Sequence, residues 1–443
     1  MFEKPPQWQK LITGALVEKI RSSKEIYEIL TKARKEYVYW DKFKYFPFPK
    51  NITPEEAWAF LKLTRSSSEK TPVKSILGDN FTYSLTKNLY QKLNFIDTHG
   101  SGLLKSFKDK PSNTQTSKYI ISSLTEEAIA SSQIEGANTT HKIAKEMILS
   151  QRKPRNKSEQ MIVNNYLAMQ KMEEWKDLDL TEQMLLDLQK ILVDQTVDDV
   201  SIIGRFRNDK DDIVVHDPIT GEIAHVPPKE ENMISELKML IKYANAQEND
   251  DEEFIHPVIK ATILHFWFAY LHPFADGNGR SSRAIFYWYL LKKNYWLIEY
   301  ISVSRTIKQS RKAYDNAFLY SENDDNDMTY FLLYITDAFK KSIIQFMEYF
   351  EKKMQEAQEL KKTTSVLGKF NMRQVVLLKY FLAHGDEYTD VITHQNKHGI
   401  SRPSAYNDLR FLVQRGFLTE TRKGKRLIYM PKISKIKEVF RSV

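Results

Sequence analysis

The sequence predicts a mainly helical protein built from two or three domains. Three observations support this: the chain has 443 residues, 42% of them are apolar, and Gly and Pro are scarce at 14 and 15. A chain of this length exceeds what one hydrophobic core usually fills. The composition excludes a disordered or collagen-like chain. Because cysteine is absent, a disulfide scaffold, a thiolate metal site and a cysteine nucleophile are excluded as well.

Residues 1–116 are expected to form a helical N-terminal region with aromatic-rich connections, and the polar stretch 108–117 is expected to be a linker. The chain starts with charged residues and lacks the apolar stretch and cleavage site of a signal peptide. The most apolar segment, 261–291, is interrupted by His, Asp and Arg, so it does not fit a membrane span. We therefore expect a soluble cytoplasmic protein with no membrane partner.

Residues 117–360 are expected to form a second, helical domain. Helical patterns cover 118–134, 158–172, 181–194, 256–271, 279–293 and 304–360. The segment 212–226 differs, because two short β-prone runs flank the turn sequence DPITG. This pattern predicts a hairpin within 211–228.

A polar loop with the sequence HPFADGNGRSSR joins the two most apolar helices. His272 ends the first helix, because Pro273 disfavours helix before it. Gly277 and Gly279 permit a tight turn with accessible backbone N–H groups at the start of the next helix. Arg280 and Arg283 occupy that first turn, where the helix dipole disfavours cations. This arrangement is favourable if a polyanion, such as the phosphate chain of a nucleotide, binds there.

The same loop carries side chains suited to chemistry. Asp276 would hold Mg²⁺ against phosphate oxygens, and His272 would take a proton from an attacking hydroxyl. Asn278 would donate a hydrogen bond to a phosphate or an oxyanion. The loop is neither a Walker A motif nor a dinucleotide fingerprint, since it follows a helix and Ser282 replaces the third glycine.

HPFADGNGRSSR resembles the signature of Fic-domain proteins, H-x-F-x-[DE]-G-N-G-R-x-x-R, at every fixed position, and the resemblance extends over about residues 118–360. It implies an all-helical Fic core with a hairpin flap that aligns a target segment by strand-like pairing. The implied activity is transfer of AMP from ATP to a Ser, Thr or Tyr hydroxyl of a target protein or of the enzyme itself. The implied roles are His272 as base, Asp276 as Mg²⁺ ligand, and Gly277, Asn278, Gly279, Arg280 and Arg283 as nucleotide ligands.

A second motif lies upstream, where Ser131, Glu135 and Gly136 form S-x-x-x-E-G. Glu135 falls in the last turn of its helix, where the dipole disfavours an anion, so pairing with Arg283 would relieve two conflicts at once. The motif resembles the inhibitory helix of Fic proteins, placed here at 117–137. The resemblance implies an autoinhibited resting state, and in some relatives the same Glu helps to remove AMP.

Residues 361–443 are strongly basic, with 17 Lys and Arg against 6 Asp and Glu. Helices are expected at 371–384, 388–396 and 401–415, followed by a basic hairpin, an order that resembles a winged helix-turn-helix. An anionic partner is expected for this segment. The side chains expected at duplex DNA are Arg402, Tyr406, Asn407 and Arg410 in the major groove, and Arg422, Lys423, Lys425 and Arg426 at phosphates. The same fold also serves as a protein-docking module.

The leading hypothesis is an autoinhibited protein adenylyltransferase that uses ATP and Mg²⁺. Two alternatives remain open: a DNA-binding regulator whose Fic core senses nucleotide without turnover, and a Fic enzyme that uses another phosphate-containing donor or removes AMP. His272 and Asp276 favour chemistry, because sensing alone needs neither. A homo-oligomer is also left open.

Overall fold

The computed structural model describes residues 3–65, 69–100, 113–150, 152–217, 220–246, 254–367, 370–385, 387–423 and 426–441. The chain is mainly helical, as predicted, and the strands of the described residues form three two-stranded antiparallel hairpins. It divides into two compact units, Met1–Phe346 and Met347–Val443. No helix in these ranges combines the length and the apolar character needed to cross a membrane.

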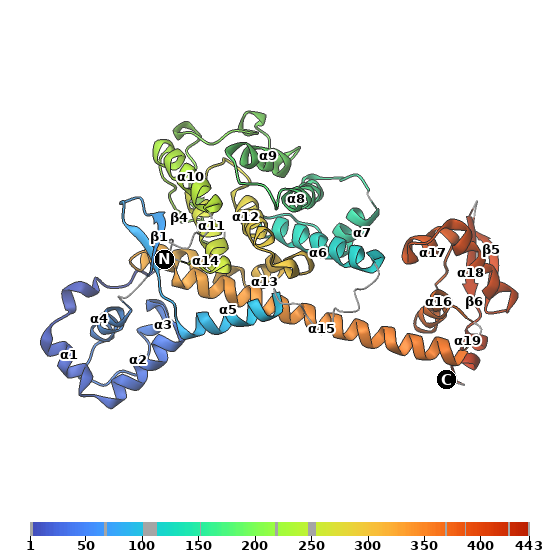
Figure 1. Ribbon diagram of the computed structural model, residues 1–443, viewed down its shortest axis with the longest axis horizontal. Coiled ribbons are helices and arrows are strands. Elements are labelled where there is room, and N and C mark those ends of the chain that lie inside the picture. Colours follow the sequence, from blue (N-terminus) through green and yellow to red (C-terminus); the bar gives the residue numbers. More distant parts are fainter. Residues whose placement is uncertain are drawn as a thin grey trace. The chain divides into compact units, whose positions relative to one another are not determined.

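The first unit contains most of the helices (Figure 1). Its elements are α1 (Gly14–Arg21), α2 (Lys24–Glu36), α3 (Trp40–Phe43), α4 (Pro54–Thr64), β1 (Glu69–Lys74), β2 (Asn80–Tyr83), α5 (Lys87–Gly100), α6 (Asn113–Ile134), α7 (His141–Ser150), α8 (Lys157–Glu174), α9 (Glu182–Val193), β3 (Val215–His216), β4 (Ile223–His225), α10 (Glu230–Asn245), α11 (Pro257–Leu271), α12 (Asn278–Lys292), α13 (Val303–Gln309), α14 (Arg311–Asn323) and α15 (Thr329–Leu367).

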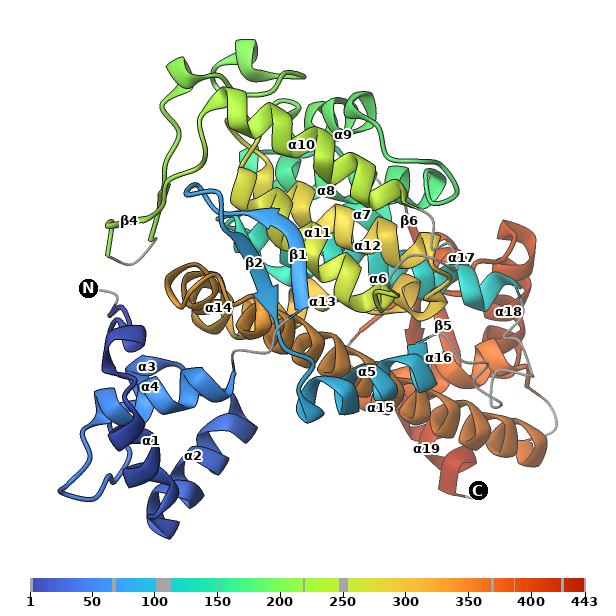
Figure 2. The same ribbon diagram turned by 60° about the vertical axis from the view of Figure 1, so that its left-hand side comes forward.

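Helices α11 and α12 form the centre of this unit. Nearly every residue of both is buried, which matches helices packed on all sides. They lie side by side in Figures 1 and 2, and α6 and α8 pack along α12. The loop between them is therefore held at both ends by the best-packed part of the protein.

The N-terminal region is not purely helical, because β1 and β2 form a hairpin that the sequence analysis did not anticipate. Phe81 of this hairpin is fully buried against Phe266 and Tyr270 of α11, and Figure 2 shows the hairpin beside α11. Residues before 117 thus belong to the same compact unit as the helical core. Of the expected linker 108–117, residues 108–112 lie outside the described residues, and α6 already begins at Asn113.

The division between the two units falls inside α15, at 346/347, whereas the sequence analysis placed a boundary at 360/361. The expected boundary was placed where the charge of the sequence changes, and this change comes 14 residues after the division. The second unit then contains α16 (Met372–Ala383), α17 (Val391–His398), α18 (Arg402–Gln414), β5 (Leu418–Lys423), β6 (Arg426–Pro431) and α19 (Ile433–Arg441). Helix α19 was not anticipated; its Ile436 is buried in the core of the unit.

Candidate active site

His272 is positioned by the end of α11. Its backbone has φ 48° and ψ 56°, and its N–H donates to the Phe268 carbonyl at 3.1 Å. The ring Nδ1 lies 3.3 Å from the Ala269 carbonyl. Because a carbonyl oxygen only accepts hydrogen bonds, Nδ1 carries the hydrogen and Nε2 keeps a lone pair. Burial, and then the nearby His225, lower the pKa of His272 to about 4, so the ring is neutral at physiological pH.

Arg207, which the sequence analysis missed, fixes the main chain of the loop. Its Nε donates to the His272 carbonyl at 2.7 Å, and its buried guanidinium also donates to the carbonyls of Leu271 and Pro228. The backbone N–H of Arg207 donates to the Pro273 carbonyl at 2.8 Å. The contact to Pro228 joins residues 21 positions apart, and those to Leu271 and His272 join residues 64 and 65 positions apart, so no local pattern indicated them.

Asn278 and Arg280 do not direct their side chains into the cavity beside His272. Asn278 exchanges two hydrogen bonds with the backbone of Phe274, at 2.9 and 2.7 Å, and so closes the loop on itself. The Arg280 side chain is 1% exposed, and its guanidinium donates to the Leu192 carbonyl at 2.7 Å and to Asp276 at 3.0 Å. Their expected roles as nucleotide ligands stay predictions.

Asp276 is the candidate Mg²⁺ ligand. Its carboxylate is half-exposed, and one oxygen accepts from Arg280. Within the described residues, no three His, Asp or Glu side chains converge to hold a metal ion. A hard carboxylate oxygen of this kind fits Mg²⁺, which usually takes one or two protein ligands and completes its shell with phosphate oxygens and water. The neighbouring Gly277 has φ +98°, a conformation strained for any other residue.

A cavity of about 170 Å³ lies next to His272. Its walls come from the ends of α6 and α11, the start of α12, one face of α14 and the hairpin β3–β4. The side chains that give it polar character are Glu135, Asp217, His225, His272, Arg283, Arg311, Asp315 and Glu322. Backbone pairing joins Val215 to His225 and His216 to Ile223 in the flap, while Pro218 and Ile219 of the expected hairpin lie outside the described residues.

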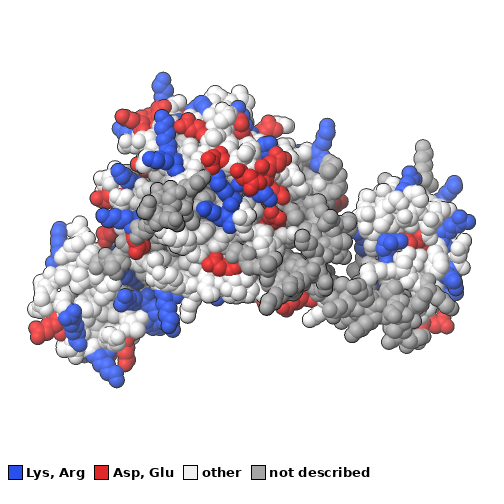
Figure 3. Space-filling view, in the orientation of Figure 1, with Lys and Arg blue, Asp and Glu red and all other residues white. Residues whose placement is uncertain are grey.

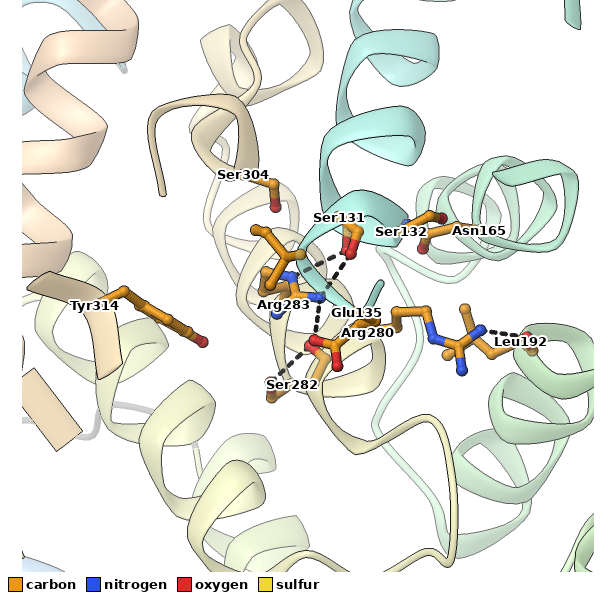
Figure 4. Close-up of polar contacts among 12 residues, drawn as sticks. Ser131, Ser132, Glu135, Asn165, Leu192, Arg280, Ser282, Arg283, Ser304 and Tyr314 are labelled. Atoms are coloured by element: carbon orange, nitrogen blue, oxygen red, sulfur yellow. Dashed lines mark hydrogen bonds and ion pairs between the residues drawn. The ribbon is translucent and has the colours of Figure 1, made fainter. Parts of the chain in front are cut away.

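Glu135 and Arg283 form the ion pair that the two helix ends predicted (Figure 4). Arg283 Nη2 donates to Glu135 Oε1 at 2.9 Å, while Nε and Nη2 donate to the hydroxyl and carbonyl of Ser131 at 2.9 and 3.1 Å. The Arg283 side chain is 3% exposed and that of Glu135 31%. Gly136 follows with φ +93° and ends the helix.

The Glu135 carboxylate also lies directly over the start of α12. A Cβ added to Gly279 would lie 2.2 Å from Glu135 Oε1. Burial alone would raise the pKa of Glu135, but the charges of Arg283 and Arg311 outweigh it, so the pKa is lowered and the group is anionic. Arg311, another residue missed from sequence, donates to the Ile134 carbonyl at the end of α6. The carboxylate thus lies at the N-terminus of α12, the end of a helix that favours an anion.

The second unit presents a basic helix to solvent. Arg402, Tyr406, Asn407 and Arg410 are exposed on α18, while Ala405 and Leu409 of the same helix are buried. The charged side chains on the face of this unit visible in Figure 3 are mainly Lys and Arg. Arg422 is exposed; nothing is described of the side chains of Lys423 and Arg426, and Lys425 lies outside the described residues.

The fold and the site together define a class: a helical protein in which a neutral histidine and the N-terminus of a buried helix line one cavity. Residues 179–290 match the model of the Fic/DOC family, so the chain carries a Fic domain. The chain is 29% identical over 119 residues to the protein adenylyltransferase Fic of Drosophila grimshawi and 28% identical to that of Drosophila mojavensis. Each match covers 27% of this chain and 22% of the relative, so the chain spans about a fifth of the length of these curated relatives.

Similar solved structures include a Fic family protein from Desulfovibrio desulfuricans G20, with 19% identity and a TM-score of 0.49 over 79% of this chain and 97% of that one. Residues 134–508 of Fic-1 from C. elegans are similar with 15% identity and a TM-score of 0.48, over 80% of this chain and 90% of that one.

Proposed function

We propose that this chain transfers AMP from ATP to a hydroxyl group of a target protein. The observation that carries the proposal is one cavity lined by His272, whose Nε2 is unprotonated, by Arg283, and by Gly279 at the N-terminus of α12. A proton acceptor beside an anion-binding helix end is what phosphoryl-type transfer requires. The printed name of the curated relatives, protein adenylyltransferase, supports the same activity.

In the proposed reaction, the hydroxyl oxygen of the target attacks the α-phosphorus of ATP. His272 Nε2 takes the hydroxyl proton, a phosphate ester forms, and the bond from the α-phosphorus to the bridging oxygen breaks to release pyrophosphate. The backbone amides at Gly277 and Gly279 and the guanidinium of Arg283 would hold the outer phosphates. Mg²⁺ held by Asp276 would supply charge neutralisation on the phosphate oxygens.

We infer further that the structure represents an inhibited state. The Glu135 carboxylate occupies Arg283 and covers Gly279, so it competes for the groups that the outermost phosphate would use. Removal of AMP by the same Glu, and use of another phosphate-containing donor, are the other outcomes that the experiment has to separate.

The test is intact-mass spectrometry of the purified protein after incubation with ATP and Mg²⁺. Wild type and Glu135→Gly are compared, with His272→Ala in the Glu135→Gly background as the inactive control. A mass increase equal to AMP in the Glu135 variant alone supports both the reaction and its inhibition. Parallel incubations with GTP and CTP identify the donor, and absence of any mass increase in all of them contradicts the proposal.

A second candidate function, binding of duplex DNA by the C-terminal unit, is favoured by the exposed face of α18. Arg402, Tyr406, Asn407 and Arg410 stand on it at spacings of four, one and three residues, which places them along one side of a helix. Binding measured over a range of salt concentrations should weaken steeply as salt rises if phosphates are neutralised. Absent or salt-insensitive binding would favour protein docking instead.

A further inference from the structure

The flap hairpin is tied to the helical core by the side chain of His225. This side chain is 10% exposed, whereas Ile223, two residues earlier in β4, is 59% exposed. Its Nδ1 lies 2.8 Å from Glu322 Oε2 of α14, and its Nε2 lies 2.7 Å from the main-chain oxygen of Tyr270 in α11. The Tyr270 ring packs on the imidazole with centroids 4.7 Å apart. One side chain therefore joins the flap to two helices that line the cavity.

The two partners determine the protonation state of His225. A peptide carbonyl oxygen only accepts hydrogen bonds, and an ionised carboxylate only accepts as well. Each ring nitrogen must therefore carry a hydrogen, so the geometry describes an imidazolium ion held between Glu322 and the Tyr270 carbonyl. Hydrogen bonds of a charged donor to a carboxylate are stronger than those between neutral groups.

We propose that His225 is a positioning residue for the transfer reaction: as a cation bound between Glu322 and the Tyr270 carbonyl, it clips the flap to the cavity wall beside His272. Tyr270 lies two residues before His272 in the chain, so the clip fixes the flap relative to the base. The consequence for catalysis rests on the proposed function, in which the target hydroxyl is delivered along the flap. The clip itself depends only on the contacts of His225.

The charges around His225 set how the clip responds to pH. Glu322 of α14 faces the ring as an anion, while Arg207, from the segment before the flap, opposes its positive charge. His272, the other titratable group beside His225, is neutral in the pH range concerned. Burial alone would lower the pKa of His225, but the charge and hydrogen bond of Glu322 and the Tyr270 carbonyl outweigh it and raise the pKa. The clip is therefore complete below that raised pKa and is lost as the pH rises through it.

The test is amide hydrogen exchange in the flap of the full chain, without nucleotide, from about pH 6 to about pH 9, corrected for the intrinsic pH dependence of exchange. The probes are the N–H groups of Asp217 and Gly221, which donate to Glu222 and Asp217 carbonyls at 2.8 and 2.9 Å. In wild type we expect exchange to become about tenfold faster as His225 loses its proton. His225→Phe should show the fast rate at every pH.

Glu322→Gln provides the sharper variant, because it keeps the size and an accepting oxygen but removes the charge. The pH at which the flap loosens should then move downward, which a purely steric role for Glu322 would not produce. His216→Phe is the matched control. His216 is exposed on the facing strand, and its Nδ1 lies 3.1 Å from the Gly221 carbonyl of the same hairpin, so its loss should leave the pH of the flap transition unchanged.

The inference is overturned if flap exchange in wild type shows no transition, or if Glu322→Gln leaves the transition where it was. Exchange in α12 serves as the check on folding, and if His225→Phe fails that check, the Glu322→Gln shift decides alone. The exchange experiment contains no ATP, so its result does not depend on whether the protein transfers AMP. A protein that is inactive in the labelling experiment but has a pH-dependent flap would refute only the proposed function. Active enzyme with an unresponsive flap would refute only the clip.

Discussion

Replacement of Glu135 by Gly is the most informative perturbation of this protein. It removes the carboxylate from Arg283 and uncovers Gly279, yet Arg283 keeps both of its bonds to Ser131 and Arg311 keeps its bond to the Ile134 carbonyl. Glu135 follows the last residue of α6, so glycine there interrupts no helical hydrogen bond of the interior. The folded state should therefore survive while the competition with phosphate disappears.

The size of the effect follows from the contact that is lost. A hydrogen bond between charged groups contributes about 1.5–3 kcal/mol, and about 1.4 kcal/mol corresponds to a factor of ten. Because the Glu135 side chain is 31% exposed, solvent weakens the pair and the lower end applies. We expect AMP labelling to rise about tenfold at an ATP concentration below saturation.

The assay is the initial rate of self-labelling with labelled ATP and Mg²⁺. Glu135→Gln, which keeps the shape but not the charge, should give an intermediate rate. Glu126→Gln is the matched control, since Glu126 lies on the same helix but pairs with His141 and Lys145 away from the cavity. Equal rates for Glu135→Gly and wild type, with both proteins folded, would refute the reasoning.

Four further outcomes follow from the same contacts. In the Glu135→Gly background, His272→Ala should reduce the initial rate of AMP labelling about 10²–10⁴-fold. Because the pKa of His272 is lowered to about 4, kcat/KM for ATP should stay level from about pH 7 down to about pH 5 and fall only at lower pH, where the ring gains a proton. A fall in kcat/KM near the ordinary histidine pKa would contradict this assignment. Gly279→Ala in the Glu135→Gly background should weaken ATP binding in calorimetry, because the added methyl group occupies the nest. Arg207→Ala should lower the free energy of unfolding by about 2–3 kcal/mol, since buried carbonyls lose their donor. Arg205→Ala breaks a partly exposed ion pair with Asp211 and should cost under about 1 kcal/mol in the same denaturation assay.

Two parts of the site could be predicted from the sequence, one from a local sequence pattern and one from the electrostatics of helix ends. The glycine loop was visible as contiguous sequence, and the pairing of Glu135 with Arg283 followed from an anion at a helix C-terminus and a cation at a helix N-terminus. Neither inference required knowledge of how distant helices pack.

The rest depended on contacts between segments far apart in the chain. The direction of the Arg280 side chain was not predictable, because the carbonyl that holds it belongs to Leu192 of α9. Arg207, Arg311 and His225 were missed for the same reason: each contacts residues that sequence spacing does not bring near. The hairpin β1–β2 could have been predicted, because its strands alternate between buried and exposed residues, a pattern that the sequence reflects with a period of two.

The hydrogen bond from His272 Nδ1 to the Ala269 carbonyl has a consequence for how this protein can change. The His272 ring is oriented by a main-chain oxygen, and Arg207 holds the adjoining loop through main-chain oxygens as well. If the proposed function holds, substitutions in the cavity walls would alter which nucleotide or which target segment is admitted while leaving the tautomer of His272 untouched. Chemical competence and substrate preference would then be set by different atoms and could diverge independently.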